Sequence, residues 1–450
     1  MARSRTLFVC NECGGSSPKW VGQCPDCGQW NTLEESRATP AARVVGWTGE
    51  APRLISEVEA ESEAESRWST GIGELDRVLG GGLVPGSVTL IGGDPGIGKS
   101  TLLLQAAVRL AGELPTLYVT GEESLRQVGM RARRIGMEGG GLHLLAETNI
   151  ERILAQADAT RPRVLVVDSV QTMHTDALQS APGAVAQLRE SSARLVRYAK
   201  QGGPAVFLVG HVTKDGAIAG PRVLEHMVDA VLYFESDLGS RFRIIRAVKN
   251  RFGAANEIGV FAMTAQGLRE VPNPSSIFLS GHDGRVSGSA IMVAREGSRP
   301  LLVEVQALVD ESHSGNPRRV SVGLDSNRLA LLLAVTHRHA GIAMFDQDVF
   351  VNVVGGVRIV ETAADLPMLL AALGSLRDRP LEQGLVSFGE VGLAGEIRPV
   401  PYGEERLREA AKHGFKRAVV PAANAPRSGM GGLEIVPVKR LGEAIEAAFG

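Results

Sequence analysis

Apolar and polar positions follow each other along the chain in two patterns, short apolar runs and longer helical stripes. The apolar runs that we interpret as strands are 88–91, 116–120, 163–169 and 205–209. A helix-like stripe follows the first run, over 102–110. Strands that alternate with helices are typical of a parallel α/β sheet, and the carboxyl ends of its strands line a ligand crevice. The pattern therefore predicts an α/β domain that begins near Arg67.

The segment between the first run and its helix fits the complete phosphate-binding loop pattern. It consists of Gly93, Asp94, Pro95, Gly96, Ile97, Gly98, Lys99, Ser100 and Thr101. Glycines let successive backbone N–H groups turn toward a phosphate, and the N-terminus of the new helix adds partial positive charge. We expect Lys99 to reach the β- and γ-phosphates and Ser100 to ligate Mg²⁺. The loop predicts that the chain binds a nucleoside triphosphate.

Polar side chains follow the other apolar runs and are expected at the same edge of the sheet. Asp168 ends its run, Glu122 and Glu123 follow the second run, and His211 follows the last. Asp168 is predicted to hold Mg²⁺ through its water shell, and Glu122 to orient the attacking water. His211 is predicted to sense the γ-phosphate or nearby DNA, with an ordinary polar residue as the alternative. Register alone decides between Glu122 and Glu123.

All four cysteines lie within eighteen residues near the start of the chain, with the spacing C-x2-C-x10-C-x2-C. They are Cys10, Cys13, Cys24 and Cys27. Two such knuckles complete the tetrahedral shell of a structural Zn²⁺, and the alternative is a pair of disulfides or idle thiols. So short a module cannot bury a sizeable core, so we expect the metal to supply folding energy on the order of 10 kcal/mol.

Composition limits the remaining possibilities. The stretch 37–66 is predicted to be an acidic flexible linker, because carboxylates alternate with small residues over 57–65; a partner-binding tail is the alternative. The balance of 48 Lys plus Arg against 50 Asp plus Glu leaves no global basic field, so any nucleic-acid surface must be local. No apolar run approaches the roughly 20 residues of a membrane span. We therefore expect a cytoplasmic protein without membrane contact.

The motifs together identify a family resemblance. The cysteine knuckles, the phosphate loop and the segments 118–124 (YVTGEES) and 249–253 (KNRFG) resemble those of the RadA (Sms) family of bacterial DNA-repair proteins. The resemblance extends over essentially the whole chain. It implies a zinc-finger module over 1–36, a RecA-like ATPase domain over 67–272 and a Lon protease-like domain of α+β class over 273–450.

The same resemblance implies a function. It implies a DNA-dependent ATPase that uses ATP, forms a homohexameric ring and moves on single-stranded DNA. Such a motor drives branch migration of recombination intermediates in DNA repair. Branched DNA and a recombinase or replication-fork protein are the implied partners. The alternatives are an ATP-dependent protease and a nucleotide-controlled adaptor or autokinase without translocation.

The run 241–248 alternates between polar and apolar residues, which predicts an exposed edge strand that ends at the KNRFG motif. In a ring ATPase, a cation supplied by a neighbouring subunit stabilises charge on the transferring phosphoryl group. Lys249 or Arg251 is predicted to be this cation. The alternative is an ordinary basic loop packed on Phe252.

The C-terminal segment 386–400 resembles the corresponding part of the Lon protease domain, which uses a Ser-Lys dyad. By motif register the serine position falls at Ala364 and the lysine position at Glu404, so we predict a proteolytically silent domain. The candidate DNA-binding residues are dispersed over two domains. They are Lys214, Arg222, Arg318, Arg319 and Arg328.

Overall fold

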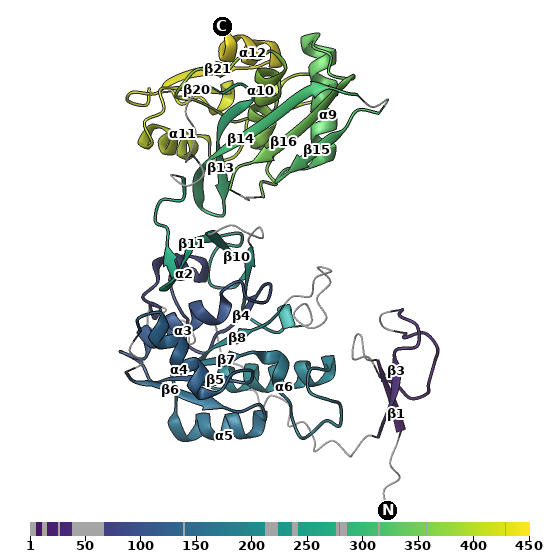
Figure 1. Ribbon diagram of the computed structural model, residues 1–450, viewed down its shortest axis with the longest axis vertical. Coiled ribbons are helices and arrows are strands. Elements are labelled where there is room, and N and C mark those ends of the chain that lie inside the picture. Colours follow the sequence, from purple (N-terminus) through teal and green to yellow (C-terminus); the bar gives the residue numbers. More distant parts are fainter. Residues whose placement is uncertain are drawn as a thin grey trace, which may run out of the picture. The chain divides into compact units, whose positions relative to one another are not determined.

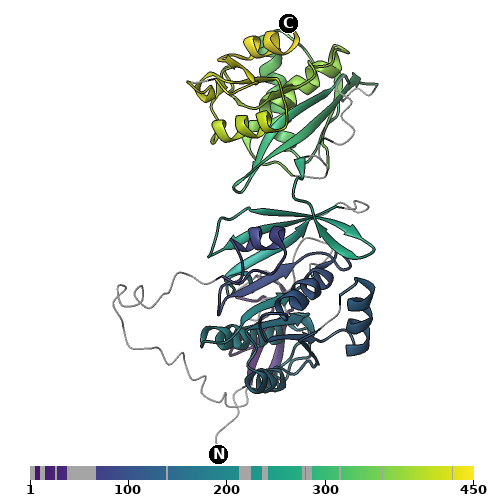
Figure 2. The same ribbon diagram turned by 90° about the vertical axis from the view of Figure 1, so that its left-hand side faces the viewer.

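The computed structural model describes residues 6–10, 16–25, 28–37, 67–137, 140–211, 224–235, 242–275, 279, 286–313, 316–355, 358–427 and 429–450. The chain divides into two compact units, Met1–Val271 and Pro272–Gly450. Figures 1 and 2 show the elements of both units from two directions. No helix within the described ranges is both long and apolar enough to cross a membrane.

The N-terminal cysteine module is a small antiparallel sheet in the order β2-β1-β3. Its strands are β1 (Thr6–Cys10), β2 (Ser16–Ser17) and β3 (Leu33–Arg37). Cys10, Cys24 and Leu33 form its core, with Phe8 packed against them. A core of this size contributes little stability by itself, which agrees with a fold that depends on a metal. The predicted linker after Arg37 lies outside the described residues.

The first unit is built on a nine-stranded sheet in the order β12-β11-β10-β9-β4-β8-β7-β5-β6. Its parallel strands are β4 (Val88–Gly92), β5 (Thr116–Thr120), β6 (Leu142–Ala146), β7 (Val164–Asp168), β8 (Ala205–Val209) and β9 (Ala230–Glu235). An antiparallel extension follows, with β10 (Phe242–Asn250), β11 (Ile258–Thr264) and β12 (Gly267–Glu270). The four strands predicted from apolar runs are confirmed, and each is buried along its whole length, as a sheet covered on both faces requires.

Helices cover both faces of this sheet (Figure 1). One core cluster joins the sheet to α2 (Gly73–Leu79), α3 (Lys99–Leu110) and α4 (Leu125–Arg134). A second cluster joins the opposite face to α5 (Ile150–Thr160) and α6 (Val185–Lys200). The helix predicted after the phosphate loop is therefore present, and the predicted α/β class is confirmed.

The strand β10 corrects one prediction. Its alternating sequence predicts an exposed edge strand, yet β10 pairs with β9 on one side and β11 on the other. Burial along β10 does not alternate, because Ile244 and Ile245, which lie on opposite faces, are both buried. Arg246 forms an ion pair with Glu235 of the neighbouring strand β9 at 2.8 Å. The strand is therefore an inner strand of the sheet rather than an exposed edge.

The second unit contains a seven-stranded mixed sheet in the order β15-β16-β14-β13-β17-β20-β21. Its strands are β13 (Ser289–Glu296), β14 (Arg299–Glu311), β15 (Arg319–Val322), β16 (Gln347–Val353), β17 (Leu385–Ser387), β20 (Arg417–Pro421) and β21 (Glu434–Val438). A separate pair is formed by β18 (Glu390–Val391) and β19 (Ile397–Arg398). The helices are α9 (Ser326–Ala340), α10 (Asp365–Leu376), α11 (Gly403–Lys412) and α12 (Leu441–Phe449). The unit therefore belongs to the α+β class that was predicted.

Candidate nucleotide site

The candidate site lies at the carboxyl ends of neighbouring parallel strands. The order β4-β8-β7-β5 places these ends at one edge of the sheet, and Thr120 of β5 pairs directly with Asp168 of β7. The phosphate loop follows β4, and Glu122 follows β5. Carboxyl ends of parallel strands form the usual ligand crevice of open α/β sheets. Residues that are far apart in the sequence thereby meet at one edge.

The phosphate loop turns directly from β4 into α3. Gly98 precedes the first helical residue with a φ of 121°, and a Cβ at this position would lie 2.9 Å from Cε of Met263. Gly96 also has a positive φ, of 76°, but its missing side chain would point into open space. The loop is therefore packed against the protein behind Gly98 and open in front of Gly96, as a phosphate cradle requires.

Lys99 is the buried cation of this loop. Its ammonium donates hydrogen bonds to the carbonyl oxygens of Gly93 at 2.6 Å and Asp94 at 2.8 Å. Burial lowers the pKa of Lys99 to about 8, against the opposing effect of the carboxylates of Asp168, Asp94 and Glu122. The side chain is thus mostly charged at neutral pH. It lies inside the loop that is expected to bind the phosphates.

Two carboxylates face this edge of the sheet in different environments. Asp168 is 8% exposed and accepts a hydrogen bond from the hydroxyl of Tyr118 at 2.5 Å. Glu122 is about half exposed, accepts a hydrogen bond from the Ser169 hydroxyl, and has its Oε1 3.5 Å from Nε2 of His211. The buried carboxylate is suited to a fixed cation and the accessible one to a water molecule.

Glu123 and Glu122 have different interaction partners. Its carboxylate forms an ion pair with Arg131 of α4. Glu122 instead lies beside Ser169 and His211, and the side-chain amide of Gln171 holds the His211 backbone through hydrogen bonds of 2.9 and 3.0 Å. The choice between the two glutamates, which sequence register left open, therefore has a geometric basis in favour of Glu122.

The residues present fit a Mg²⁺-nucleotide. The Ser100 hydroxyl lies at the start of α3, and the Asp168 carboxylate is buried at the end of β7. Mg²⁺ prefers such hard oxygen ligands and keeps several of its waters. Ser100 and Asp168 are thus the groups that would hold the ion.

The KNRFG motif lies at the other end of the strands of the same sheet. Since β10 is antiparallel to β9, its last residue Asn250 pairs with the first residue of β9, Ala230. A shift of register between Ala247 and Lys249 leaves Val248 unpaired and exposed, which is a β-bulge. The motif therefore lies at the amino ends of the parallel strands, away from the phosphate loop of its own chain.

The two cations of this motif have different surroundings. The Lys249 ammonium donates to the carbonyl oxygens of Glu225 and Val228, both at 2.7 Å, and burial lowers its pKa. The Arg251 side chain is 61% exposed, and its Nε lies 4.0 Å from Oδ1 of the buried Asp229. Arg251 is thus the cation of the pair that presents its charge to solvent.

The predicted zinc ligands are described in part. Cys10 and Cys24 are almost completely buried, at 1% and 2% exposure. Cys13 and Cys27 lie outside the described residues. The two described sulfurs share the core of the ribbon, where a structural metal would lie.

Of the candidate DNA-binding residues, the structure describes Arg318, Arg319 and Arg328. Lys214 and Arg222 lie outside the described residues. Arg319 donates to backbone carbonyls, including that of Met344 at 2.6 Å, and Arg328 is bonded to the buried Asp365 at 2.9 Å. These two arginines therefore stabilise the second unit itself. Arg318 keeps a side chain that is 66% exposed, 3.5 Å from Asp348.

The positions that would carry a protease dyad hold unreactive side chains. Ala364 is buried at the end of the short 3₁₀ turn Thr362–Ala364. Glu404 lies in α11 and forms an ion pair with Arg408. Neither a nucleophile nor its base is present at these two positions.

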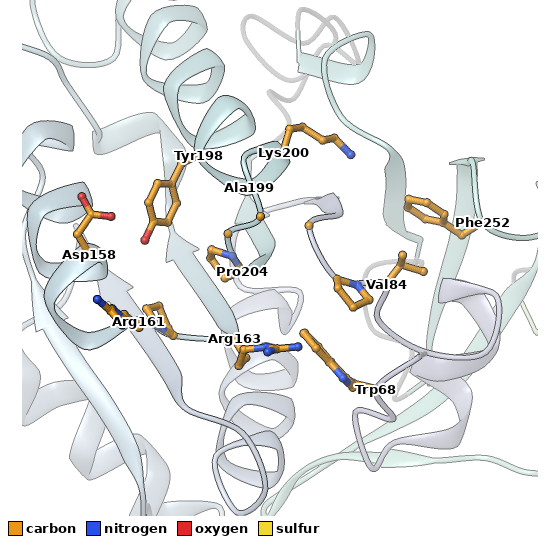
Figure 3. Close-up of a pocket in the computed structure, with 15 residues that line it drawn as sticks. Trp68, Val84, Asp158, Arg161, Arg163, Tyr198, Ala199, Lys200, Pro204 and Phe252 are labelled. Carbon is orange, nitrogen blue, oxygen red and sulfur yellow. The ribbon is translucent and has the colours of Figure 1, made fainter. Parts of the chain in front are cut away.

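Sequence reasoning missed a second hollow in the first unit, at the amino ends of β4, β7 and β8. This cavity has a volume of about 780 Å³. Figure 3 shows Arg163 beside Trp68 and Tyr198 facing Asp158. The Arg163 guanidinium lies 4.7 Å from the centre of the Trp68 ring. Apart from Phe252 of the KNRFG motif, no motif marks the lining residues, because they come from helices and loops that are far apart in the sequence.

Comparison with known proteins agrees with this organisation. Three family models match: rubredoxin metal binding domain over 8–35, AAA domain over 56–217 and subunit ChlI of Mg-chelatase over 325–424. The predicted zinc module and nucleotide-binding core are confirmed at this level. Full-length relatives named DNA repair protein RadA were found in several bacteria. The Pseudomonas aeruginosa protein is 61% identical over 100% of both chains, the Escherichia coli protein 59% over 98% of both, and the Bacillus subtilis protein 47% over 100% of both. The chain therefore belongs to the DNA repair protein RadA family.

Proposed function

We propose that this protein is a DNA-dependent ATPase motor of DNA repair and homologous recombination, which moves on single-stranded DNA and drives branch migration. The name of its relatives supports the repair role. The observation that carries the motor proposal is the separation of Arg251 from the phosphate loop. Arg251 lies at the amino ends of the parallel strands, and the loop lies at their carboxyl ends. Arg251 lies away from the nucleotide of its own copy, which supports a role at the nucleotide of another copy.

Such a shared site requires a directional assembly. The carboxyl ends of the strands of one copy, with the phosphate loop, would face the amino ends of the strands of the next copy, with Arg251. This is a head-to-tail contact. Repeated contacts of this kind close into a ring when the rotation allows it. We therefore propose a homohexameric ring in the cytoplasm, with single-stranded or branched DNA and a recombinase or fork protein as partners.

Within this ring the residues of the loop would bind and orient ATP. The Lys99 ammonium would leave the Gly93 and Asp94 carbonyls and pair with the β- and γ-phosphates. Ser100 and Asp168 would hold Mg²⁺, which neutralises charge on the phosphate oxygens. The backbone N–H groups of the loop would hold the β-phosphate at the N-terminus of α3.

Glu122 would orient the attacking water. Its carboxylate accepts a hydrogen bond from that water and takes up its proton as the water oxygen bonds to the γ-phosphorus and ADP leaves. The Ser169 hydroxyl and His211 support this orientation, because both lie against the Glu122 carboxylate.

Arg251 would complete the site from the neighbouring copy. An arginine supplied in this way accelerates phosphoryl transfer by roughly 10³ to 10⁵ in related ATPases and GTPases. Lys249 is committed to two backbone carbonyls, so its role is to hold the turn that presents Arg251. The C-terminal unit would serve as a scaffold without proteolytic activity, since Ala364 and Glu404 supply no dyad.

Mixed assemblies test this proposal. Arg251→Ala and Lys99→Ala proteins should each lack ATPase activity stimulated by single-stranded DNA. Mixing them should restore part of it, because some interfaces then combine an intact loop with an intact Arg251. A mixture of Arg251→Ala with the double variant Lys99→Ala, Arg251→Ala is the control and should stay inactive. Absence of restored activity, with subunit exchange shown by fluorescence transfer, would contradict a shared site.

A further inference from the structure

The buried carboxylate at the end of β7 depends on a hydroxyl from the next strand. Asp168 accepts through its Oδ2 the hydrogen bond from Tyr118, whose side chain is 1% exposed. We infer that Tyr118 is a positioning residue that holds Asp168 in place for Mg²⁺-dependent nucleotide binding. This inference rests on the proposed function, because it assumes that Asp168 holds the ion.

The sheet itself explains why Tyr118 reaches Asp168. In the register of β5 and β7, Tyr118 pairs with Val166 and Thr120 pairs with Asp168. Residues two apart on one strand share a face, so Tyr118 and Asp168 are diagonal neighbours on the same face. A long aromatic side chain spans this diagonal distance. Tyr118 also packs in the core cluster that contains α3, whose first residue is Lys99.

The hydroxyl can act only as a donor to the carboxylate. Burial and the charge of Asp168 raise the pKa of Tyr118 far above its ordinary value, so the phenol keeps its proton. The hydrogen bond uses Oδ2 of Asp168, and Oδ1 has no hydrogen bond with any described residue. One oxygen is thus held by the strand, and the other is available to a water of the metal ion.

Loss of the hydroxyl would redirect Asp168 toward Lys99. Asp168 is the carboxylate that raises the pKa of Lys99 most, so the two charges already interact. A buried carboxylate that loses its hydrogen-bond donor is expected to move toward another donor, because an unpaired buried charge lowers the stability of the fold. A direct pair with Lys99 would draw Asp168 away from the ion.

The chain offers a second tyrosine beside an aspartate, at the amino ends of the strands, as a matched control. Tyr198 on α6 faces Asp158, and both residues line the cavity at the amino ends of the strands (Figure 3). Burial and the charge of Asp158 raise the pKa of Tyr198 to about 12. Tyr198→Phe removes the same chemical group from the same kind of pair. It leaves the edge that binds the nucleotide unchanged.

The test measures binding of a fluorescent ATP analogue to the full-length protein as free Mg²⁺ is raised from a depleted buffer. Tyr118→Phe should raise the Mg²⁺ concentration for half-maximal binding about tenfold, as expected for a lost hydrogen bond to a charged group. Binding without Mg²⁺ should change little, whereas the thermal unfolding midpoint should fall by a few degrees, because a buried carboxylate loses its donor. Tyr198→Phe should leave the Mg²⁺ titration unchanged. A wild-type titration for Tyr118→Phe would overturn the inference.

Variants of Asp168 separate this inference from the proposed function. In an Asp168→Asn background, adding Tyr118→Phe should produce no further shift, because the hydroxyl acts through the carboxylate. A further tenfold shift there would refute that route. If Asp168→Asn alone left the Mg²⁺ titration unchanged, the proposed function would lose its metal ligand. If Asp168→Asn shifted the Mg²⁺ titration but Tyr118→Phe did not, only the positioning role of Tyr118 would be refuted. Tyr118→Met, which also lacks a hydroxyl, replaces Tyr118→Phe if the latter does not fold.

Discussion

Substitution of Glu122 by glutamine tests which of the two adjacent glutamates acts on the attacking water. Glutamine keeps the shape and one oxygen that can accept from the Ser169 hydroxyl, but it cannot take up a proton. Loss of a general base lowers the rate of a chemical step by about 10²- to 10⁴-fold. Since Glu122 is 44% exposed, we expect a change in unfolding free energy within about 0.5 kcal/mol. Removal of a negative charge near the phosphates should leave ATP affinity unchanged or slightly higher.

Glu123→Gln is the matched control. It removes a half-buried ion pair with Arg131, a contact of about 0 to 1 kcal/mol in stability, and should leave hydrolysis near the wild-type rate. Single-turnover hydrolysis of labelled ATP, with protein in excess and single-stranded DNA present, measures the chemical step apart from product release. Hydrolysis by the Glu122 variant within twofold of wild type would refute the assignment. A slow Glu123 variant beside it would transfer the role to Glu123.

Two further predictions concern charge and metal. Lys99 with a pKa of about 8 should lose its charge above that pH, so ATP affinity should fall about tenfold between pH 7 and pH 9. Equilibrium binding measures this, and a Lys99→Ala protein with the same decline would assign it to another group. Cys24→Ser should release zinc and unfold the N-terminal ribbon, because Cys24 lies in its small core, while the ATPase core still binds nucleotide. Stoichiometric zinc in this variant, measured by atomic absorption, would contradict a four-thiolate site.

Local features of this protein could be predicted from the sequence. The phosphate loop and the strand before it combine an apolar run with glycines at fixed spacing, so loop and helix were located without long-range information. The cysteine spacing similarly predicts a metal ribbon. Asp168 and Glu122 could be placed at one edge because parallel strands align their carboxyl ends.

Features that depend on pairing between distant strands could not be predicted. Tyr118 occupies a position typical of a core strand residue, and its hydroxyl gains a partner only through the register of β5 and β7. The alternation around Arg246 predicts an edge strand, but β10 is paired on both sides, because the sequence of one strand does not reveal which strands pair with it. Likewise, Lys249 and Arg251 look equivalent in the motif, and only the carbonyls of Glu225 and Val228 distinguish them.

The position of Arg251 at the edge opposite the phosphate loop has a consequence for stoichiometry. If each ATP site takes its loop from one copy and its arginine from the next, an isolated copy has no complete site. An open row of copies has one complete site fewer than its number of chains, and closure adds the missing one. Activity per chain should then rise with protein concentration and reach its full value only in the closed ring. Dilution would therefore switch off hydrolysis before it unfolds a single domain.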